Sequence, residues 1–150
     1  MQTPDPIRDL ALLVGRLGIG VIFLAHGWQK LTSGVGGVAA MFEQAGVPAP
    51  GLSAVIAVVI ELAGGAAMII GLAVPVAGVL IALLMAGAFT FVHVSNGIFV
   101  SQGGFEFVLI LGVTALLLAA FGSGRFGLDR VLAPHLPGRG DRESARSQVS

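Results

Sequence analysis

The chain has 150 residues, of which 55% are hydrophobic and 11% charged, and 8 basic and 8 acidic residues give it a formal net charge of zero. Soluble domains carry about 25% charged residues, so this composition excludes an ordinary soluble domain and indicates a membrane protein. A neutral chain has no general attraction for nucleic acid. The absence of cysteine excludes disulfides, thiol chemistry and thiolate-bound metal or iron–sulfur sites.

Four apolar segments are long enough to cross a bilayer as helices, because about 20 residues span roughly 30 Å of hydrocarbon. They cover about 10–30, 52–71, 74–94 and 105–122. Lipid supplies no hydrogen bonds to the backbone, so each segment is expected to be helical. The N-terminus lacks the pattern of a cleaved signal peptide, and we expect the first segment to be retained. The predicted fold is all-α: a bundle of four transmembrane helices within residues 10–124.

The segments between and after these helices differ in kind. The first connection contains Val38 to Ala45, a short amphipathic stretch between glycines and prolines, which predicts a helix lying at the membrane interface. Gly71 and Pro75 suit the end of one helix and the first turn of the next. Residues 125–150 are basic and then polar, which predicts a disordered tail.

Lys and Arg placement predicts the orientation, because positive charge is retained on the cytoplasmic side. The N-terminus, residues 1–9, carries Arg8, and the two long connections contain only Lys30. The chain after the fourth segment is arginine-rich: Arg125, Arg130, Arg139, Arg142 and Arg146. We therefore predict that both termini are cytoplasmic and that both long connections face the other, outer side.

Glu61 is a lone carboxylate inside an apolar stretch. It lies about nine residues from the outer end of its segment, which corresponds to a depth of roughly 13 Å. A carboxylate at this depth costs several kcal/mol unless it is protonated, paired or facing a polar cavity, so it marks a candidate functional site. The alternative is a structural one, in which Glu61 is a protonated or hydrogen-bonded strut that fixes the helix register.

Four more ionisable residues fall in the outer half of the predicted bundle: His26, Lys30, His93 and Glu106. His26 and Lys30 lie one turn apart on one helix face. Each residue has a structural alternative. Lys30 can extend to the headgroups, and His93 can bond a loop carbonyl or another helix. Glu106 can be stabilised by a helix N-terminus. Arg16 lies near the inner boundary, where a structural role is favoured.

Two chemistries fit the outer residues. Histidine, lysine and a carboxyl group can hydrogen-bond the carbonyl oxygens of a quinone and exchange protons with it. Imidazole and carboxylate can also bind zinc, iron or manganese, but the spacing matches no metal motif, and no metal site is assigned. No nucleotide-binding loop or nucleophile elbow occurs in a plausible context. The glycines of Gly15-Arg-Leu-Gly-Ile-Gly20 lie inside a predicted membrane helix and suit helix packing.

Three sequence pieces in order resemble the DoxX family: Arg16-Leu-Gly-Ile-Gly-Val-Ile-Phe-Leu-Ala-His-Gly-Trp-Gln-Lys30, then Phe42 with Gly46-Val-Pro48, then Glu61-Leu-Ala-Gly-Gly65. Gly122-Ser-Gly124 before Leu128-Asp129 is similar to the family's ending. The resemblance covers about residues 10–132 and implies a small four-helix protein of the bacterial inner membrane. The motif residues that it carries over are Arg16, His26, Gly27, Lys30, Glu61, Gly64 and Gly65.

The resemblance also implies a link to quinone-dependent oxidoreductase systems and to oxidative and thiol stress, in which relatives act with soluble proteins. It does not assign a catalytic residue. We interpret the chain as a membrane subunit of a redox system, with no covalent cofactor and with a quinone-like ligand as the candidate. Soluble redox or stress proteins and further copies of the chain are the candidate partners. The alternatives are a non-catalytic anchor that recruits soluble proteins, and a small proton-coupled permease.

Overall fold

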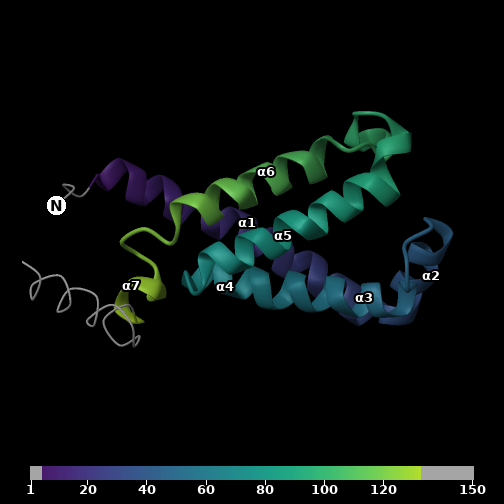
Figure 1. Cartoon of the computed structure of the whole chain (residues 1–150), viewed down its shortest axis with the longest axis horizontal. Coiled ribbons are helices and arrows are strands. Elements are labelled where there is room, and N and C mark those ends of the chain that lie inside the picture. The colour runs from purple at the N-terminus through teal and green to yellow at the C-terminus, as the bar shows by residue number, and fades with distance from the viewer. Residues whose placement is uncertain (1–4, 133–150) are drawn as a thin grey trace, which may run out of the picture.

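The computed structural model describes residues 5–132, and no strand occurs among them. The α-helices are α1 (Pro6–Ser33), α2 (Val35–Gln44), α3 (Pro50–Val59), α4 (Gly65–Ile70), α5 (Val74–Ala88), α6 (Glu106–Phe121) and α7 (Leu128–Leu132) (Figure 1). Two π-helical turns, η1 (Ile60–Gly64) and η2 (Phe89–His93), follow α3 and α5. Two short 3₁₀ turns, η3 (Val94–Asn96) and η4 (Val100–Gln102), lead toward α6. The predicted all-α fold class is confirmed.

Within residues 5–132, three continuous helices are long and apolar enough to cross a membrane: Pro6–Ser33, Pro50–Ile70 and Val74–Asn96. The second runs through α3, η1 and α4, and the third through α5, η2 and η3. The fourth apolar segment is helical as well, but α6 has 16 residues and is shorter than the others. The structure therefore shows three helices of spanning length, and a fourth crossing by α6 stays a prediction.

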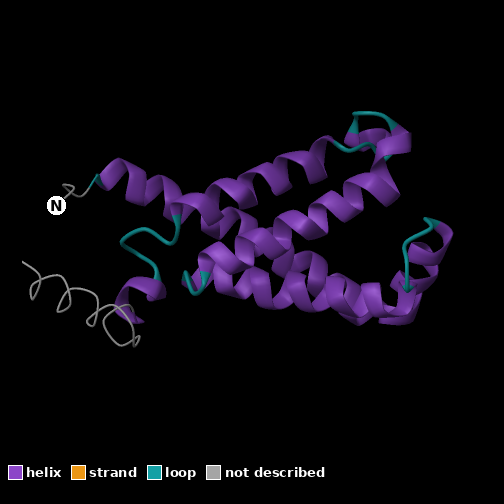
Figure 2. Cartoon of the chain, in the orientation of Figure 1, coloured by secondary structure: helices purple, strands orange, loops and turns teal. Residues whose placement is uncertain are grey.

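The helices form an elongated bundle with two distinct ends. α5 packs along α6, and α1 packs along η1 and α4. α2 folds against α3 and lies with residues 94–105 at one end, which we call the α2 end (Figure 1). Asp5 and α7 lie at the opposite end, the α7 end. Figure 2 shows that the non-helical connections gather at the ends of the bundle.

α2 is the helix that the sequence predicts in the first connection, and it begins at Val35 instead of Val38. Its apolar side contributes Val38, which is buried. Whether α2 lies at a membrane interface stays a prediction. It is nevertheless placed over the end of the bundle, because it packs against α3 and, more lightly, α1.

Glycine allows the helices to approach closely where they cross. A Cβ atom on Gly20 would lie 2.8 Å from the Gly65 carbonyl oxygen, and one on Gly65 would lie 2.9 Å from that of Gly20. Gly78 of α5 similarly faces the Ala115 backbone of α6, at 2.6 Å from its added Cβ. Membrane helices gain packing contact in this way, since lipid provides little hydrophobic drive for association. The core between them includes Phe23, Met68, Ile81, Ala115 and Leu118.

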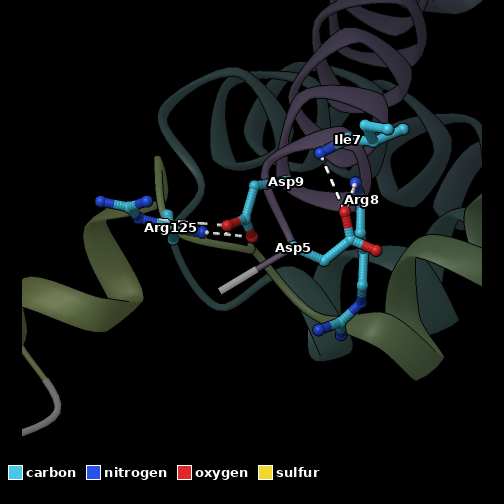
Figure 3. Close-up of polar contacts among 5 residues, drawn as sticks. All are labelled: Asp5, Ile7, Arg8, Asp9 and Arg125. Atoms are coloured by element: carbon cyan, nitrogen blue, oxygen red, sulfur yellow. Dashed lines mark hydrogen bonds and ion pairs between the residues drawn. The ribbon is translucent and has the colours of Figure 1, made fainter. Parts of the chain in front are cut away.

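The segment after α6, residues 122–132, contains α7 and folds back across this end of the bundle. We call it the C-terminal strap. Asp9 of α1 accepts a hydrogen bond from the Arg125 backbone N–H at 3.1 Å, and its carboxylate lies 4.0 Å from the Arg125 side chain (Figure 3). Asp5 caps α1 by accepting from the N–H groups of Ile7 and Arg8. The α7 end is therefore tied together by acidic side chains and backbone donors.

Asp129 and Arg16 complete the attachment of the strap. Asp129 accepts from the N–H groups of Ala73 and Val74, at 2.6 and 3.2 Å, and so caps the start of α5. Arg16 is fully buried and donates to the Phe126 carbonyl at 3.3 Å. Gly71 has a positive φ of 71°, and its missing side chain leaves room for the Arg16 guanidinium. Arg16 thus contacts the strap, and the structural role that the sequence favours for it stays a prediction.

Residues 125–132 are the start of the segment for which the sequence predicts a disordered tail. They are folded in the structure and include α7. Arg139, Arg142, Arg146 and the remainder of that predicted tail lie outside the described residues, so the prediction for them is untested.

Candidate functional site

An ion pair between Lys30 and Glu61 lies between α1 and η1. Lys30 Nζ donates to Glu61 Oε1 at 2.5 Å. The Glu61 side chain is 3% exposed and that of Lys30 25% exposed, so the carboxylate is enclosed while the Lys30 side chain is partly open. Glu61 Oε2 is buried and has no hydrogen-bond partner in the part of the chain that the structure describes. Because an unpaired carboxylate is costly in a low-dielectric interior, Lys30 is the group that makes a charged Glu61 tolerable there.

The local backbone explains how the pair forms. Glu61 lies in the π turn η1, whose widened turn changes the direction of the side chains from those of the preceding helix. Gly27 of α1 faces this turn: a Cβ atom on Gly27 would lie 2.9 Å from Leu62 Cγ and 3.0 Å from Glu61 Cβ. Gly64 packs against Ile81, and Gly65 against Gly20. The three motif glycines therefore bring helices close around Glu61.

A cavity of about 550 Å³ opens beside the pair toward the α2 end. Four of the five ligand-binding candidates line it: His26, Lys30, Glu61 and His93. They come from α1, η1 and η2. The other walls are mostly apolar and include Phe23, Phe42, Ile56, Leu83, Phe107 and Leu111. The structure thus brings together an ion pair and two imidazoles in a largely apolar chamber.

The two histidines differ in their surroundings. His26 lies one turn before Lys30, is exposed, and its ring centroid is 6.4 Å from that of Phe107. His93 is partly buried, and its Nδ1 is 2.6 Å from the Gly103 carbonyl oxygen. A carbonyl can only accept, so Nδ1 carries the proton and Nε2 is left for another partner. The loop-carbonyl bond considered from the sequence for His93 is therefore present.

Glu106 is not among the residues that line the cavity. It is exposed at the start of α6, where its Oε1 accepts from the Val100 N–H at 2.6 Å. The Asn96 side chain bonds Gly103 and Val92 nearby. Glu106 thus orders the connection between η2 and α6, and the structure does not bring it to the Lys30–Glu61 pair.

Several residues that contribute to the cavity were not predicted from the sequence. Phe42 and Met41 of α2 and Ser53 of α3 line it, so the first connection forms part of the wall. The π turns η1 and η2, which contain Glu61 and His93, were not predicted either. Gly64 and Gly65 follow Glu61 and permit a departure from regular α-helix there. No sequence pattern, however, distinguishes a π turn from an α-helical turn.

Within residues 5–132, no group of three or more His, Asp or Glu side chains is arranged to hold a metal ion. No ligand cluster in this part of the chain therefore supports the metal-binding alternative. The arrangement is better suited to an organic ligand: apolar walls would surround a ring, and a few polar groups would fix its orientation. Lys30 can donate hydrogen bonds in addition to the one that Glu61 accepts, because an ammonium group has three donors.

Comparison with known proteins adds the family. The DoxX family model matches residues 11–94. A Bacillus subtilis (strain 168) protein named "Putative oxidoreductase CatD" is 34% identical over 121 residues, which cover 81% of this chain and 86% of the relative. The chain belongs to the DoxX family. The Escherichia coli (strain K12) "Inner membrane protein YqjF" is 30% identical over 127 residues, covering 84% of this DoxX chain and 95% of the relative.

No solved structure matches this DoxX chain. The region matched by the DoxX model runs from α1 to η3, so it includes the four ionisable residues that line the cavity: His26, Lys30, Glu61 and His93. Glu106 and α6 lie beyond it. The ionisable part of the cavity therefore lies within the matched region.

Proposed function

We propose that this DoxX protein is an integral membrane subunit of a redox system and that it binds a quinone-like ligand in the cavity beside Lys30 and Glu61. The name of the Bacillus subtilis relative supports the redox part. The observation that supports a ligand here is the partly buried ion pair at the wall of a largely apolar cavity of about 550 Å³. Ligand pockets typically measure about 300–1,000 Å³ and combine apolar walls with few polar groups.

Lys30 and Glu61 have different tasks in this proposal. Lys30 is partly exposed and lines the cavity, so its free ammonium hydrogens donate to a quinone carbonyl. Glu61 is almost fully buried and positions Lys30 through the 2.5 Å contact. His26 is exposed at the same wall, one turn away, where an imidazole can exchange protons with its surroundings. A partner protein supplies the electrons, because the chain has no cysteine and no nucleotide-binding motif.

The arrangement in the membrane is part of the same proposal. α6 makes the fourth crossing, the α7 end is cytoplasmic, and the membrane is the bacterial inner membrane, as the name of the Escherichia coli relative states for that protein. Arg8, Arg125 and Arg130 lie at the α7 end, which fits retention of positive charge on the cytoplasmic side. The α2 end and the cavity then face the outer half of the bilayer.

Mass spectrometry of organic extracts tests the ligand. The gently solubilised parent is compared with Glu61→Gln, Lys30→Gln and His26→Ala. Gln29→Ala is the matched control, because Gln29 neighbours Lys30 but does not line the cavity. We expect near-stoichiometric quinone in the parent and the control and its loss from the cavity variants, in samples whose thermal unfolding shows that they are folded. A parent with no more quinone than bulk membrane lipid would refute the ligand and favour the anchor function.

Topology has its own test, which the lack of native cysteine makes simple. Ser101→Cys lies in the exposed turn η4 at the α2 end, and Arg130→Cys lies in α7. A membrane-impermeant maleimide is added to cells whose outer membrane has been removed. It is expected to label Ser101→Cys at once and Arg130→Cys only after the inner membrane is permeabilised. Labelling of both positions from the same side would contradict the crossing by α6.

A further inference from the structure

One of the open sides of the cavity lies between α3 and α5. Ile56 of α3 is 46% exposed and Leu83 of α5 is 64% exposed, although both line the cavity. Phe91, further along the same continuous helix as Leu83, lines the cavity and is 41% exposed. Residues that contact both the interior and the surroundings form the rim of an opening. This rim is apolar on both helices.

The opening results from the way the two helices separate. α5 packs against α4 and η1 but scarcely touches α3. Figure 1 shows α3 and α5 diverging toward the α2 end. Glu61 lies in η1, where the helices are still in contact, so the ion pair sits at the closed end of the opening. A ligand headgroup at Lys30 therefore has a continuous apolar path toward Ile56 and Leu83.

The depth of the rim identifies what surrounds it. Leu83 is nine residues into α5, about 14 Å along the helix axis from its start, and Ile56 is about 9 Å from the start of α3. Both positions are within helices of spanning length. Hydrocarbon, and not water, is the medium at such positions in a membrane-spanning helix. The rim is apolar as that medium requires.

Gly87 lies one turn after Leu83 and keeps the opening wide. It lines the cavity, and a Cβ atom added to it would meet no atom within 4 Å. Gly87 is helical and has no positive φ. Glycine inside a helix lowers stability by roughly 0.5–1 kcal/mol relative to alanine. Packing does not require a glycine here, in contrast to Gly20, Gly65 and Gly78.

We infer that the ligand enters sideways from the hydrocarbon layer between α3 and α5, and that it is an amphiphile whose apolar tail lies across Ile56, Leu83 and Gly87 while its headgroup reaches Lys30. The inference rests on the proposed function for the headgroup and adds the route and the tail. The rim residues then determine the preference for the tail, whereas the ion pair holds the ring. A tailless ring has no need of the space at Gly87.

Gly87→Phe tests the route by filling the opening. The added ring occupies empty space at a helical position, so the fold is expected to tolerate it. Gly18→Phe is the matched control: Gly18 is an exposed glycine of α1, also with no atom within 4 Å of an added Cβ, and it does not line the cavity. Thermal unfolding in detergent is expected to show both variants folded.

Binding is measured by calorimetry in detergent with two probes: dimethoxy-methyl-benzoquinone without a tail, and the same ring with a decyl chain. We expect Gly87→Phe to weaken the tailed probe by about tenfold or more, which is about 1.4 kcal/mol, and to leave the tailless probe unchanged. Gly18→Phe is expected to change neither, and Lys30→Gln to weaken both.

The possible outcomes test the lateral route and the proposed quinone binding separately. Equal affinities of the parent and Gly87→Phe for the tailed probe would overturn the lateral route and leave the quinone site intact. Failure of the parent to bind either probe would overturn the proposed function. A tightly bound phospholipid that the parent retains and Gly87→Phe loses would support the lateral opening and overturn the quinone headgroup.

Discussion

Lys30 and Glu61 are 31 positions apart in the sequence, and their side chains meet at 2.5 Å where α1 crosses η1. The contact joins one partly exposed and one enclosed charge. It relieves the cost of a carboxylate in an apolar helix and places an ammonium group at the cavity wall. The same pair therefore joins α1 to η1 and forms part of the cavity wall.

Removing only Lys30 is expected to destabilise the protein more than removing both partners. Lys30→Met leaves Glu61 enclosed without its partner, and breaking a buried pair costs about 3–5 kcal/mol. Because Lys30 is one-quarter exposed, we expect about 3 kcal/mol or less. The double variant Lys30→Met with Glu61→Leu removes both charges and should recover most of the loss. Thermal unfolding in one detergent measures this, and a double variant no more stable than Lys30→Met would contradict the compensation.

Gly65→Ala is expected to push α1 away from α4. Its added methyl group would lie 2.9 Å from both the Gly20 carbonyl oxygen and the Leu24 backbone nitrogen. Backbone atoms cannot rotate away as a flexible side chain can, so we expect a loss of about 1–3 kcal/mol. Quinone content should fall as well, since the same approach brings Lys30 to Glu61. Gly18→Ala serves as the control, and equal melting temperatures of the two variants would refute the close crossing.

Asp129→Ala is expected to loosen the C-terminal strap. Asp129 accepts from Ala73 and Val74 at the start of α5, and its own N–H donates to the Gly71 carbonyl at 3.0 Å. Loss of a capping side chain costs about 0.5–2 kcal/mol. Limited proteolysis should cut the variant faster after α6, while Arg130→Ala, at the exposed neighbouring residue, stays near the parent rate. Unchanged proteolysis of Asp129→Ala would show that Asp129 does not hold the strap.

His93→Phe is expected to speed ligand exchange more than it changes stability. The variant loses the hydrogen bond from Nδ1 to Gly103, which ties the connection before α6 to η2. A looser connection leaves the cavity wall near Val100 and Gly104 less ordered. Stopped-flow displacement of the tailed quinone should show a dissociation rate several times that of the parent. His93→Asn is the second variant, because its amide can still donate a hydrogen bond to the Gly103 carbonyl, and its dissociation rate is expected to stay closer to that of the parent. If the tailed quinone dissociates from His93→Phe at the parent rate as well, His93 does not restrain the wall.

Much of the candidate site could be predicted from the sequence. Glu61 is the one charged residue in its apolar segment. A charge in hydrocarbon is costly, so such a residue marks a candidate functional site. His26 and Lys30 share a helix face because they are four residues apart. These arguments depend only on depth and spacing, which the helical rise supplies directly. They selected five residues, of which four line the cavity and the fifth, Glu106, does not.

The sequence by itself determined that the chain is helical and membrane-embedded, because long apolar stretches leave the backbone no partners except its own groups. It also determined which side chains carry charge at depth. Only the tertiary structure decided that Lys30 is the partner of Glu61, that Glu106 orders a connection, and that α3 and α5 separate beside the pair. The pairing of Lys30 with Glu61 follows from the crossings at Gly20, Gly27 and Gly65 and from the π turn around Glu61. Contacts between segments distant in the sequence set this pairing, and spacing along one helix carries no information about such contacts.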